Sequence, residues 1–250
     1  MLAIGIDVAA QMKGCGYAVG YVASSGVMIE DAGLLDASFG SQSALEHLAE
    51  KIRSASGALI AIDAPLGWPA LMGPSLSDHK AGDFLKVPRR ELFRRTTDIA
   101  VKNLTGKMPL EVGAEKIAHA AHHAVEIIQR LRHLTGLPLP LAWSQQVRGA
   151  VIIEVYPGAT LAGNGIASKG YRKTDSEGIA ARLQIARQLQ HSIPLSKWTC
   201  GSVDVFDACL CLLAAKDFLG GNVARPENLE LAEKEGWIWV RPRDLEATSD

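Results

Sequence analysis

The sequence of 250 residues predicts an α/β domain whose mixed sheet begins with antiparallel strands and continues with parallel ones. Three apolar runs within residues 2–35 are separated only by short polar links, which is typical of an antiparallel meander. A segment with helical spacing, residues 41–56, then leads into a fourth apolar run at residues 58–63. Because that run follows a helical crossover, we expect it to pair in parallel with an earlier strand.

The first strands are marked by apolar runs with turn residues between them. We expect strands at residues 2–8, 15–23 and 27–35. The link at residues 11–14 is polar and contains glycine, and residues 24–26 read Ser-Ser-Gly. Both links are short enough for hairpins, so the three strands should be neighbours in one sheet.

The next segment changes its period from strand to helix. Apolar residues recur at helical spacing across residues 41–56, where Ser41 or Ser43 can cap the first turn and Gly57 fits the end of the helix. Residues 58–63 are then apolar up to a final aspartate. Such a run is typical of a strand that is buried on both faces.

A long insertion follows the fourth strand, at about residues 64–148. Its first part, residues 64–112, is rich in proline and glycine and should be irregular. Residues 114–135 carry apolar side chains at helical spacing and are followed by Gly136 and Pro138, which predicts a long amphipathic helix. We therefore expect a largely helical, partly basic insertion within a single domain.

The C-terminal part returns to the sheet and then to helices. Residues 150–155 predict a fifth strand that stops before Pro157, and residues 177–191 predict a helix. Residues 203–219 predict a strongly apolar helix, and residues 237–240 form a last short apolar stretch. The first strand, the fourth strand and the apolar helix could be neighbours in a single sheet.

Composition excludes several classes of protein. Hydrophobic residues make up 48% and charged residues 21%, and 26 Lys and Arg balance 27 Asp and Glu to a net charge of -1. These values exclude a disordered chain, a collagen-like repeat and a bulk polycation. No run of about 18 apolar residues and no basic signal-peptide start occur, so we expect no membrane span. The four cysteines form no C-x-x-C motif, and we expect a reduced, cytoplasmic protein.

Acidic residues stand at positions where apolar elements end. Asp7, Asp63 and Glu154 each lie near the carboxyl end of a predicted strand, where open α/β sheets bind ligands. Asp204 and Asp207 share one face of the apolar helix, because they are three residues apart. Several convergent carboxylates repel one another unless cations compensate, and an all-oxygen donor set suits Mg²⁺ or Mn²⁺. Two such ions can promote displacement at a phosphoryl group.

Basic residues gather in the insertion and in one later loop. Residues 80–107 contain eight Lys and Arg against three Asp and Glu, a net charge of +5, and residues 171–173 form a smaller basic cluster. The candidate phosphate-binding residues are Arg90, Arg94, Arg95 and Lys173. Only Phe84 and Phe93 lie among the basic residues of the insertion, so base stacking is poorly provided.

Six motifs together resemble one family. They occur in the family's order and span nearly the whole chain. They read GIDVA at 5–9, IAIDAPLGWP at 60–69, FRRTTD at 93–98, IIEVYPGAT at 152–160, DVFDACLCLLAA at 204–215 and EGWIWV at 235–240. On these motifs the chain resembles the domain-of-unknown-function family 429.

The resemblance implies a fold and an activity. Members of that uncharacterised family are described as predicted nucleases with a ribonuclease H-like fold, and the strand order above is similar to that core. By its pattern Asp7, Asp63, Asp204 and Asp207 would be metal ligands, and Glu154 is a further catalytic candidate on a strand that need not reach the same pocket. The implied protein is a hydrolase that cleaves DNA or RNA with Mg²⁺ or Mn²⁺.

Other interpretations remain open at this point. An actin-like kinase or ATPase shares an early Asp, but its D-x-G-x-[ST] loop is altered here at Ala9 and Gln11. A domain on the same scaffold that only binds nucleic acid or a protein is the second alternative. The spacing of His119, His122 and His123 could suit a metal, although no third ligand is evident. The sequence also leaves open a homodimer and the choice between DNA, RNA and a small phosphorylated substrate.

Overall fold

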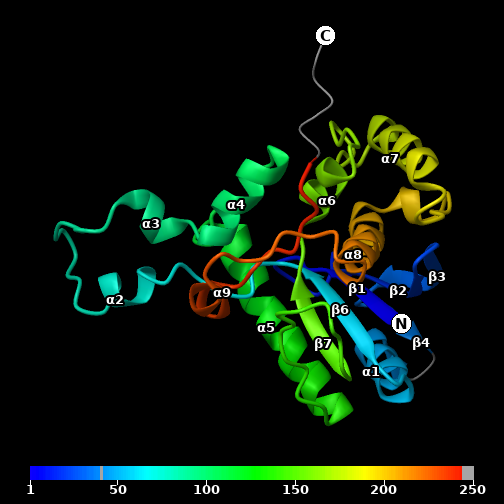
Figure 1. The fold of residues 1–250 in the computed structure, drawn as a ribbon, viewed down its shortest axis with the longest axis horizontal. Coiled ribbons are helices and arrows are strands. Elements are labelled where there is room, and N and C mark those ends of the chain that lie inside the picture. Colours follow the sequence, from blue (N-terminus) through cyan, green and yellow to red (C-terminus); the bar gives the residue numbers. More distant parts are fainter. Residues whose placement is uncertain (40–41, 244–250) are drawn as a thin grey trace.

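The computed structural model describes residues 1–39 and 42–243 and contains a five-stranded mixed sheet (Figure 1). The strand order is β3-β2-β1-β6-β7, in which β1, β2 and β3 are antiparallel and β1, β6 and β7 are parallel. The strands are β1 (Leu2–Asp7), β2 (Gly16–Ala23), β3 (Gly26–Leu34), β6 (Ala58–Asp63) and β7 (Ala150–Glu154). The predicted fold class is confirmed, and the arrangement is consistent with a ribonuclease H-like core.

Helices cover both faces of the sheet. Side chains alternate between the faces along each strand, so that Ile4 and Ile6 of β1 join one cluster while Ala3 joins the other. One face packs against α1 (Ala44–Ser54) and α5 (Glu115–Thr135). The opposite face packs against α8 (Val203–Leu219), and α8 is buried along most of its length, which explains its apolar sequence.

Glycine in the first two strands lets α8 approach the sheet closely. A Cβ atom added to Gly5 would lie 2.1 Å from the carbonyl oxygen of Ala208, and one added to Gly16 would lie 2.1 Å from that of Asp204. Any side chain at either position would therefore push α8 away from β1 and β2. This close approach brings the first two turns of α8 beside the end of β1.

The start of α1 agrees with one of the two predicted caps. The Ser43 hydroxyl accepts a hydrogen bond from the Glu46 N–H, and the Glu46 carboxylate accepts one from the Ser43 N–H. This reciprocal capping box satisfies two backbone donors at the helix N-terminus. Ser41, the other candidate, lies outside the described residues.

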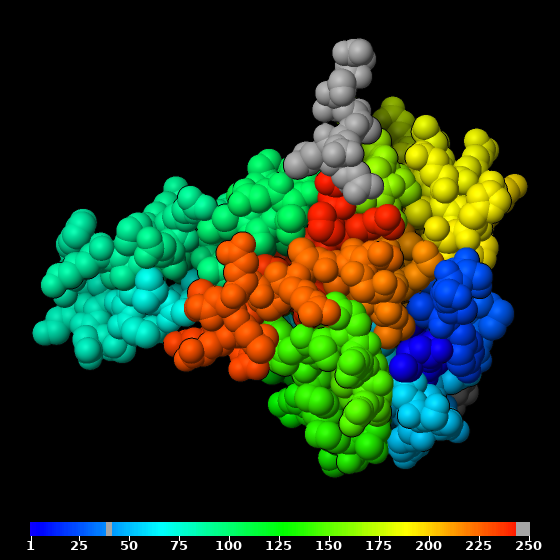
Figure 2. Space-filling model, in the orientation of Figure 1, coloured from blue at the N-terminus to red at the C-terminus, as the bar shows by residue number. Residues whose placement is uncertain are grey.

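The insertion contains more helix than expected in its first part. The segment predicted to be irregular holds α2 (Met72–Leu76), α3 (Arg89–Phe93) and α4 (Thr96–Thr105), and α5 follows. Figures 1 and 2 show that the segment around α2 and α3 projects from the rest of the molecule. We call residues 71–94 the arm. Few of its side chains are buried, so periodicity gave no signal for its short helices.

Two C-terminal helices were also missed. α6 (Pro157–Gly163) begins at the proline that was expected only to stop β7, because proline is favourable in the first turn of a helix. α9 (Leu229–Glu235) is short and mostly polar. The remaining elements are α7 (Ser176–Leu189), a 3₁₀ helix (Thr199–Gly201) and the two short strands β4 (Ser38–Phe39) and β5 (Gln42–Ser43).

The cysteines, the stretch at residues 237–240 and the lengths of the helices complete the description of the fold. All four cysteines are buried and free, as expected for small apolar side chains. The stretch at 237–240 is extended, and Ile238 forms a parallel bridge with Glu154 of β7. Within residues 1–39 and 42–243, each helix is too short or too polar to cross a membrane.

Candidate metal centre

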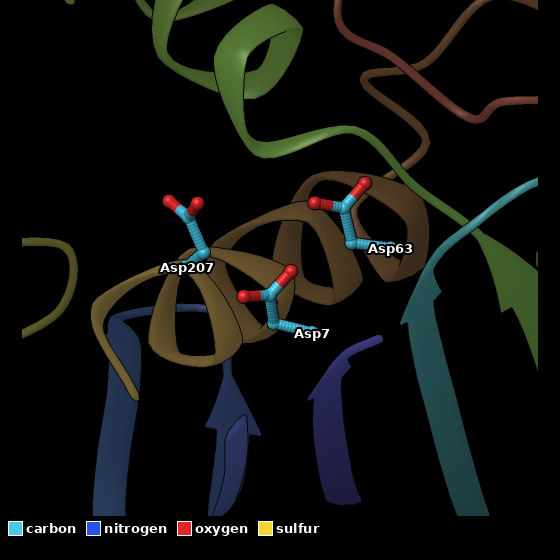
Figure 3. Close-up of side chains that lie close together, drawn as sticks. All are labelled: Asp7, Asp63 and Asp207. Carbon is cyan, nitrogen blue, oxygen red and sulfur yellow. The ribbon is translucent and has the colours of Figure 1, made fainter. Parts of the chain in front are cut away.

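Three carboxylates converge where β1 and β6 end and α8 begins. Asp7 and Asp63 are the last residues of their strands and are direct partners in the parallel pairing of β1 with β6. Asp207 projects from the second turn of α8 toward them. One ligand oxygen of each residue lies within 4.8 Å of the others, and Figure 3 shows the three side chains pointing into the same space.

The surroundings of these carboxylates disfavour their charged forms. Asp7 is 6% exposed and Asp207 is 0% exposed, while Asp63 is half-buried. Burial, with added repulsion from Asp207 and Asp63, raises the pKa of Asp7 well above its ordinary value. Burial and the Asp207 charge raise the pKa of Asp63 to about 7, and burial raises the pKa of Asp207 to about 6. Three carboxylates in such surroundings favour either protons or a cation.

Arg172 supplies positive charge at this cluster. Its Nη2 atom lies 3.2 Å from Oδ2 of Asp207, and its side chain is 54% exposed. Apart from this ion pair, neither carboxylate oxygen of Asp207 meets hydrogen-bond geometry with a described residue. A buried carboxylate without hydrogen bonds is costly, so these two oxygens favour a cationic ligand.

Asp204 and Glu154, two other predicted site residues, lie outside the group of three. Asp204 is half-buried, one helical turn before Asp207. Glu154 is 3% exposed, and its carboxylate accepts hydrogen bonds from Arg95 and from the Leu66 N–H. Its oxygens are therefore already occupied, although Glu154 lines the same pocket as Asp7 and Asp63.

Arg95 was expected to bind phosphate, and the structure gives it a different role. It is 1% exposed, and its Nη2 atom lies 2.8 Å from Glu154 Oε1 and 2.9 Å from Asp98 Oδ1. Its Nη1 atom donates to the second Glu154 oxygen at 3.0 Å. A guanidinium held by two buried carboxylates has little freedom to bind substrate, so we assign Arg95 to the support of the pocket wall.

The other predicted basic residues face solvent or bind nearby carboxylates. Arg90 is exposed, and Arg94 pairs with Glu111 at 3.2 Å between Nη2 and Oε1. The Nζ atom of Lys173 lies 2.6 Å from the Glu177 carboxylate on α7. The basic residue that reaches the acidic cluster is therefore Arg172, the neighbour of the predicted Lys173.

A cavity of about 160 Å³ opens over Asp7 and Asp63, two of the three carboxylates. The acids and Arg172 form its polar side, and Arg95 and Glu154 also line it. Its apolar side comes from the insertion, from α5 and from the segments after β7 and α9. The apolar lining includes Pro109, Leu110, Ile117, Ala120, Tyr156 and Ile238.

The family model described as protein of unknown function (DUF429) matches residues 5–230. The chain belongs to the DUF429 family. The matched range contains Arg172, the arm and the three carboxylates of Asp7, Asp63 and Asp207, which we call the DUF429 cluster. A comparison with curated proteins returned no match.

The histidines of the long helix do not join the DUF429 cluster. His123 contacts the loop after β1, with its Nδ1 atom 2.8 Å from the carbonyl oxygen of Ala9, and His122 is exposed beside Glu126. Within the described residues, the one group of acidic, histidine and cysteine side chains that could share an ion is the aspartate cluster.

Sequence reasoning missed Arg172 and Tyr156 as residues of the DUF429 pocket. Arg172 belongs to the basic cluster at residues 171–173, but nothing in a loop sequence tells which of two adjacent side chains turns inward. Tyr156 follows β7 by two positions, so its nearness to a strand end was a signal that could have found it.

Proposed function

We propose that this protein is a metal-dependent phosphodiesterase, a nuclease that hydrolyses DNA or RNA. The observation that carries the proposal is the convergence of Asp7, Asp63 and Asp207, whose oxygens lie within 4.8 Å of one another. An all-oxygen donor set of three carboxylates, with Arg172 paired to one of its oxygens, fits Mg²⁺ or Mn²⁺. We also propose a cytoplasmic location, since all four cysteines are free thiols.

The residues of the pocket have distinct proposed roles. Asp7, Asp63 and Asp207 would hold the cation, which supplies charge stabilisation for phosphoryl transfer when it is bound. Arg172 would bind a non-bridging phosphate oxygen, since its guanidinium is half-exposed at the rim and suits bidentate contact. Glu154 and Arg95 would keep the wall behind Asp63 rigid through their mutual ion pair.

Calorimetric titration with Mn²⁺ tests the cation site, and cleavage of labelled DNA and RNA tests the activity. Asp7→Asn should weaken Mn²⁺ binding by more than about 100-fold, because even residues that only orient metal ligands contribute about 10- to 100-fold. Asp204→Asn is the matched control on the neighbouring turn and should retain most of the binding. Unchanged Mn²⁺ affinity in Asp7→Asn, together with no cleavage of DNA or RNA by the unmodified protein, would reject the proposal.

Arg172→Ala should separate cation binding from substrate binding. Removal of the guanidinium that pairs with Asp207 should tighten Mn²⁺ binding about two- to fivefold, as expected for a half-exposed ion pair. The same change should raise KM for an oligonucleotide, because a phosphate contact is lost. Lys173→Ala is the control, since Lys173 binds Glu177 instead. Weaker Mn²⁺ binding in Arg172→Ala would contradict the assigned role.

A further inference from the structure

The segments on either side of the arm reach the pocket. Pro65, before the arm, and Pro109, after it, both line the cavity over the carboxylates. The Glu235 carboxylate fixes the base of the arm, since its two oxygens accept hydrogen bonds from the N–H groups of Ala70 and Thr96 at 2.7 Å. The path of the arm away from the body is therefore set by contacts beside the pocket (Figure 2).

The arm presents an aromatic ring between basic side chains. Phe84 is 88% exposed and lies between the exposed Lys80 and Lys86 in the sequence. Arg89 and Arg90 follow, both exposed. Phe84 lacks the packing that an aromatic side chain normally has, whereas its ring and the basic side chains two to six positions away, which outnumber the exposed Asp83, offer stacking and charge to a ligand.

The cavity is too small for a double helix to enter. Its volume of about 160 Å³ lies below the range of about 300–1,000 Å³ that is usual for small-molecule pockets. The buried Asp7 and the half-buried Asp63 line it, and Leu110 and Tyr156 contribute to its apolar lining. The backbone of one strand is narrow enough for a phosphate group to approach these carboxylates. A paired duplex is wider, because it presents two strands and their stacked bases together, and we expect it to approach less closely.

We propose that the protein acts on an unpaired nucleic-acid strand, which lies along the arm and enters the cavity past Arg172. Proteins that bind single strands combine a basic track for the backbone with aromatic side chains on which bases stack. Lys80, Lys86, Arg89 and Arg90 form the basic track, and Phe84 is the stacking residue. This inference rests on the proposed function, because it names the substrate class of the same site.

Fluorescence anisotropy without added metal measures binding independently of turnover. A labelled single strand should bind more tightly than the duplex of the same sequence. Phe84→Ala should weaken single-strand binding about tenfold, while Phe84→Trp should retain it. The matched control is Trp198→Ala, since Trp198 is an aromatic residue that is 63% exposed and lines a different pocket. Phe84 is almost fully exposed, so these changes leave the core intact.

The salt dependence supplies a second measurement. Replacing both Lys80 and Lys86 by Gln should reduce the slope of log Kd against log salt by about 1.4, since each phosphate contact of a single strand contributes about 0.7. Duplex binding that equals single-strand binding, or equal losses in Phe84→Ala and Trp198→Ala, would overturn the proposal. A dimer that forms with rising concentration and is lost in Phe84→Ala would overturn it too, because the arm would then bind a second copy.

Cleavage with Mn²⁺ distinguishes this inference from the proposed function. Faster cleavage of the single strand supports both. Equal cleavage of both substrates would overturn the inference and leave the nuclease proposal standing. Phe84-dependent binding of single strands without any cleavage would support the strand-binding arm and reject the nuclease activity.

Discussion

Asp63→Asn should abolish metal-dependent turnover and at the same time stabilise the metal-free protein. In the folded state the pKa of Asp63 is raised to about 7 by burial and by the Asp207 charge. Asn has nearly the same shape as the protonated side chain and carries no charge. We expect the variant to gain about 2 kcal/mol in free energy of unfolding at pH 8, since one pKa unit corresponds to about 1.4 kcal/mol and partial exposure reduces the effect.

The sign of the pH dependence follows from the raised pKa. Between the ordinary value of 3.8 and about 7, the folded state binds more protons at Asp63 than the unfolded state does. Stability of the metal-free wild type should therefore fall as pH rises through this window and level off above it. The advantage of Asp63→Asn should grow from pH 5 to pH 7 for the same reason.

Urea unfolding at several pH values measures this difference, and added Mn²⁺ provides the complementary test. Mn²⁺ should stabilise the wild type more at pH 8 than at pH 6, because protonated carboxylates bind cations weakly, and it should have little effect on Asp63→Asn. Asp204→Asn again serves as the control. A variant that is less stable than the wild type at pH 8 would contradict the electrostatic interpretation of the cluster.

Arg95→Ala should be among the most destabilising single substitutions in the protein. It removes the guanidinium that binds Glu154 and Asp98, both of which are buried. Burial raises the pKa of Glu154, and Arg95 opposes this effect. Loss of Arg95 therefore leaves a buried carboxylate without a compensating charge. We expect a loss of about 3–5 kcal/mol in free energy of unfolding, which is usual when one partner of a buried ion pair is removed.

The neighbouring arginine offers a matched control for this prediction. Arg94 pairs with Glu111, but its side chain is 22% exposed and that of Glu111 is 28% exposed. Arg94→Ala should therefore cost about 1 kcal/mol or less, as measured from urea midpoints with a common m-value. Equal losses in the two variants would show that burial does not distinguish the two arginines. Arg95→Ala with Glu154→Gln should recover part of the loss, because the uncompensated charge is removed.

The strands could be predicted from the sequence because their signal is local. Apolar runs bounded by turn residues placed β1, β2, β3, β6 and β7 within a residue or two of their observed ends. The helix α8 was predicted at its observed bounds for the same reason. The short helices of the arm could not be found this way, since most of their residues are exposed and their apolar side chains follow no period.

The candidate site was only partly predictable. Strand ends indicated Asp7 and Asp63, and helical spacing indicated Asp204 with Asp207. One helical turn advances about 5.4 Å, so two acids one turn apart cannot occupy the same place opposite the strand ends. The close packing of α8 on Gly5 decides between them, and that contact is long-range. The roles of Arg95 and Arg172 likewise depend on which side chains are buried by distant parts of the chain.

The register between β1 and β6 has a consequence for any ion at this centre. Asp7 and Asp63 are paired residues on adjacent strands, and neighbouring strands lie about 4.8 Å apart. Two aspartate side chains that start from this spacing can both reach one ion at the oxygen distances of about 2.0–2.6 Å that Mg²⁺ and Ca²⁺ prefer. The pairing of the two strands therefore fixes the separation of the backbone positions that carry these two ligands. Changes in the arm or the loops can alter what binds beside the ion without altering the distance between the two strand positions that hold it.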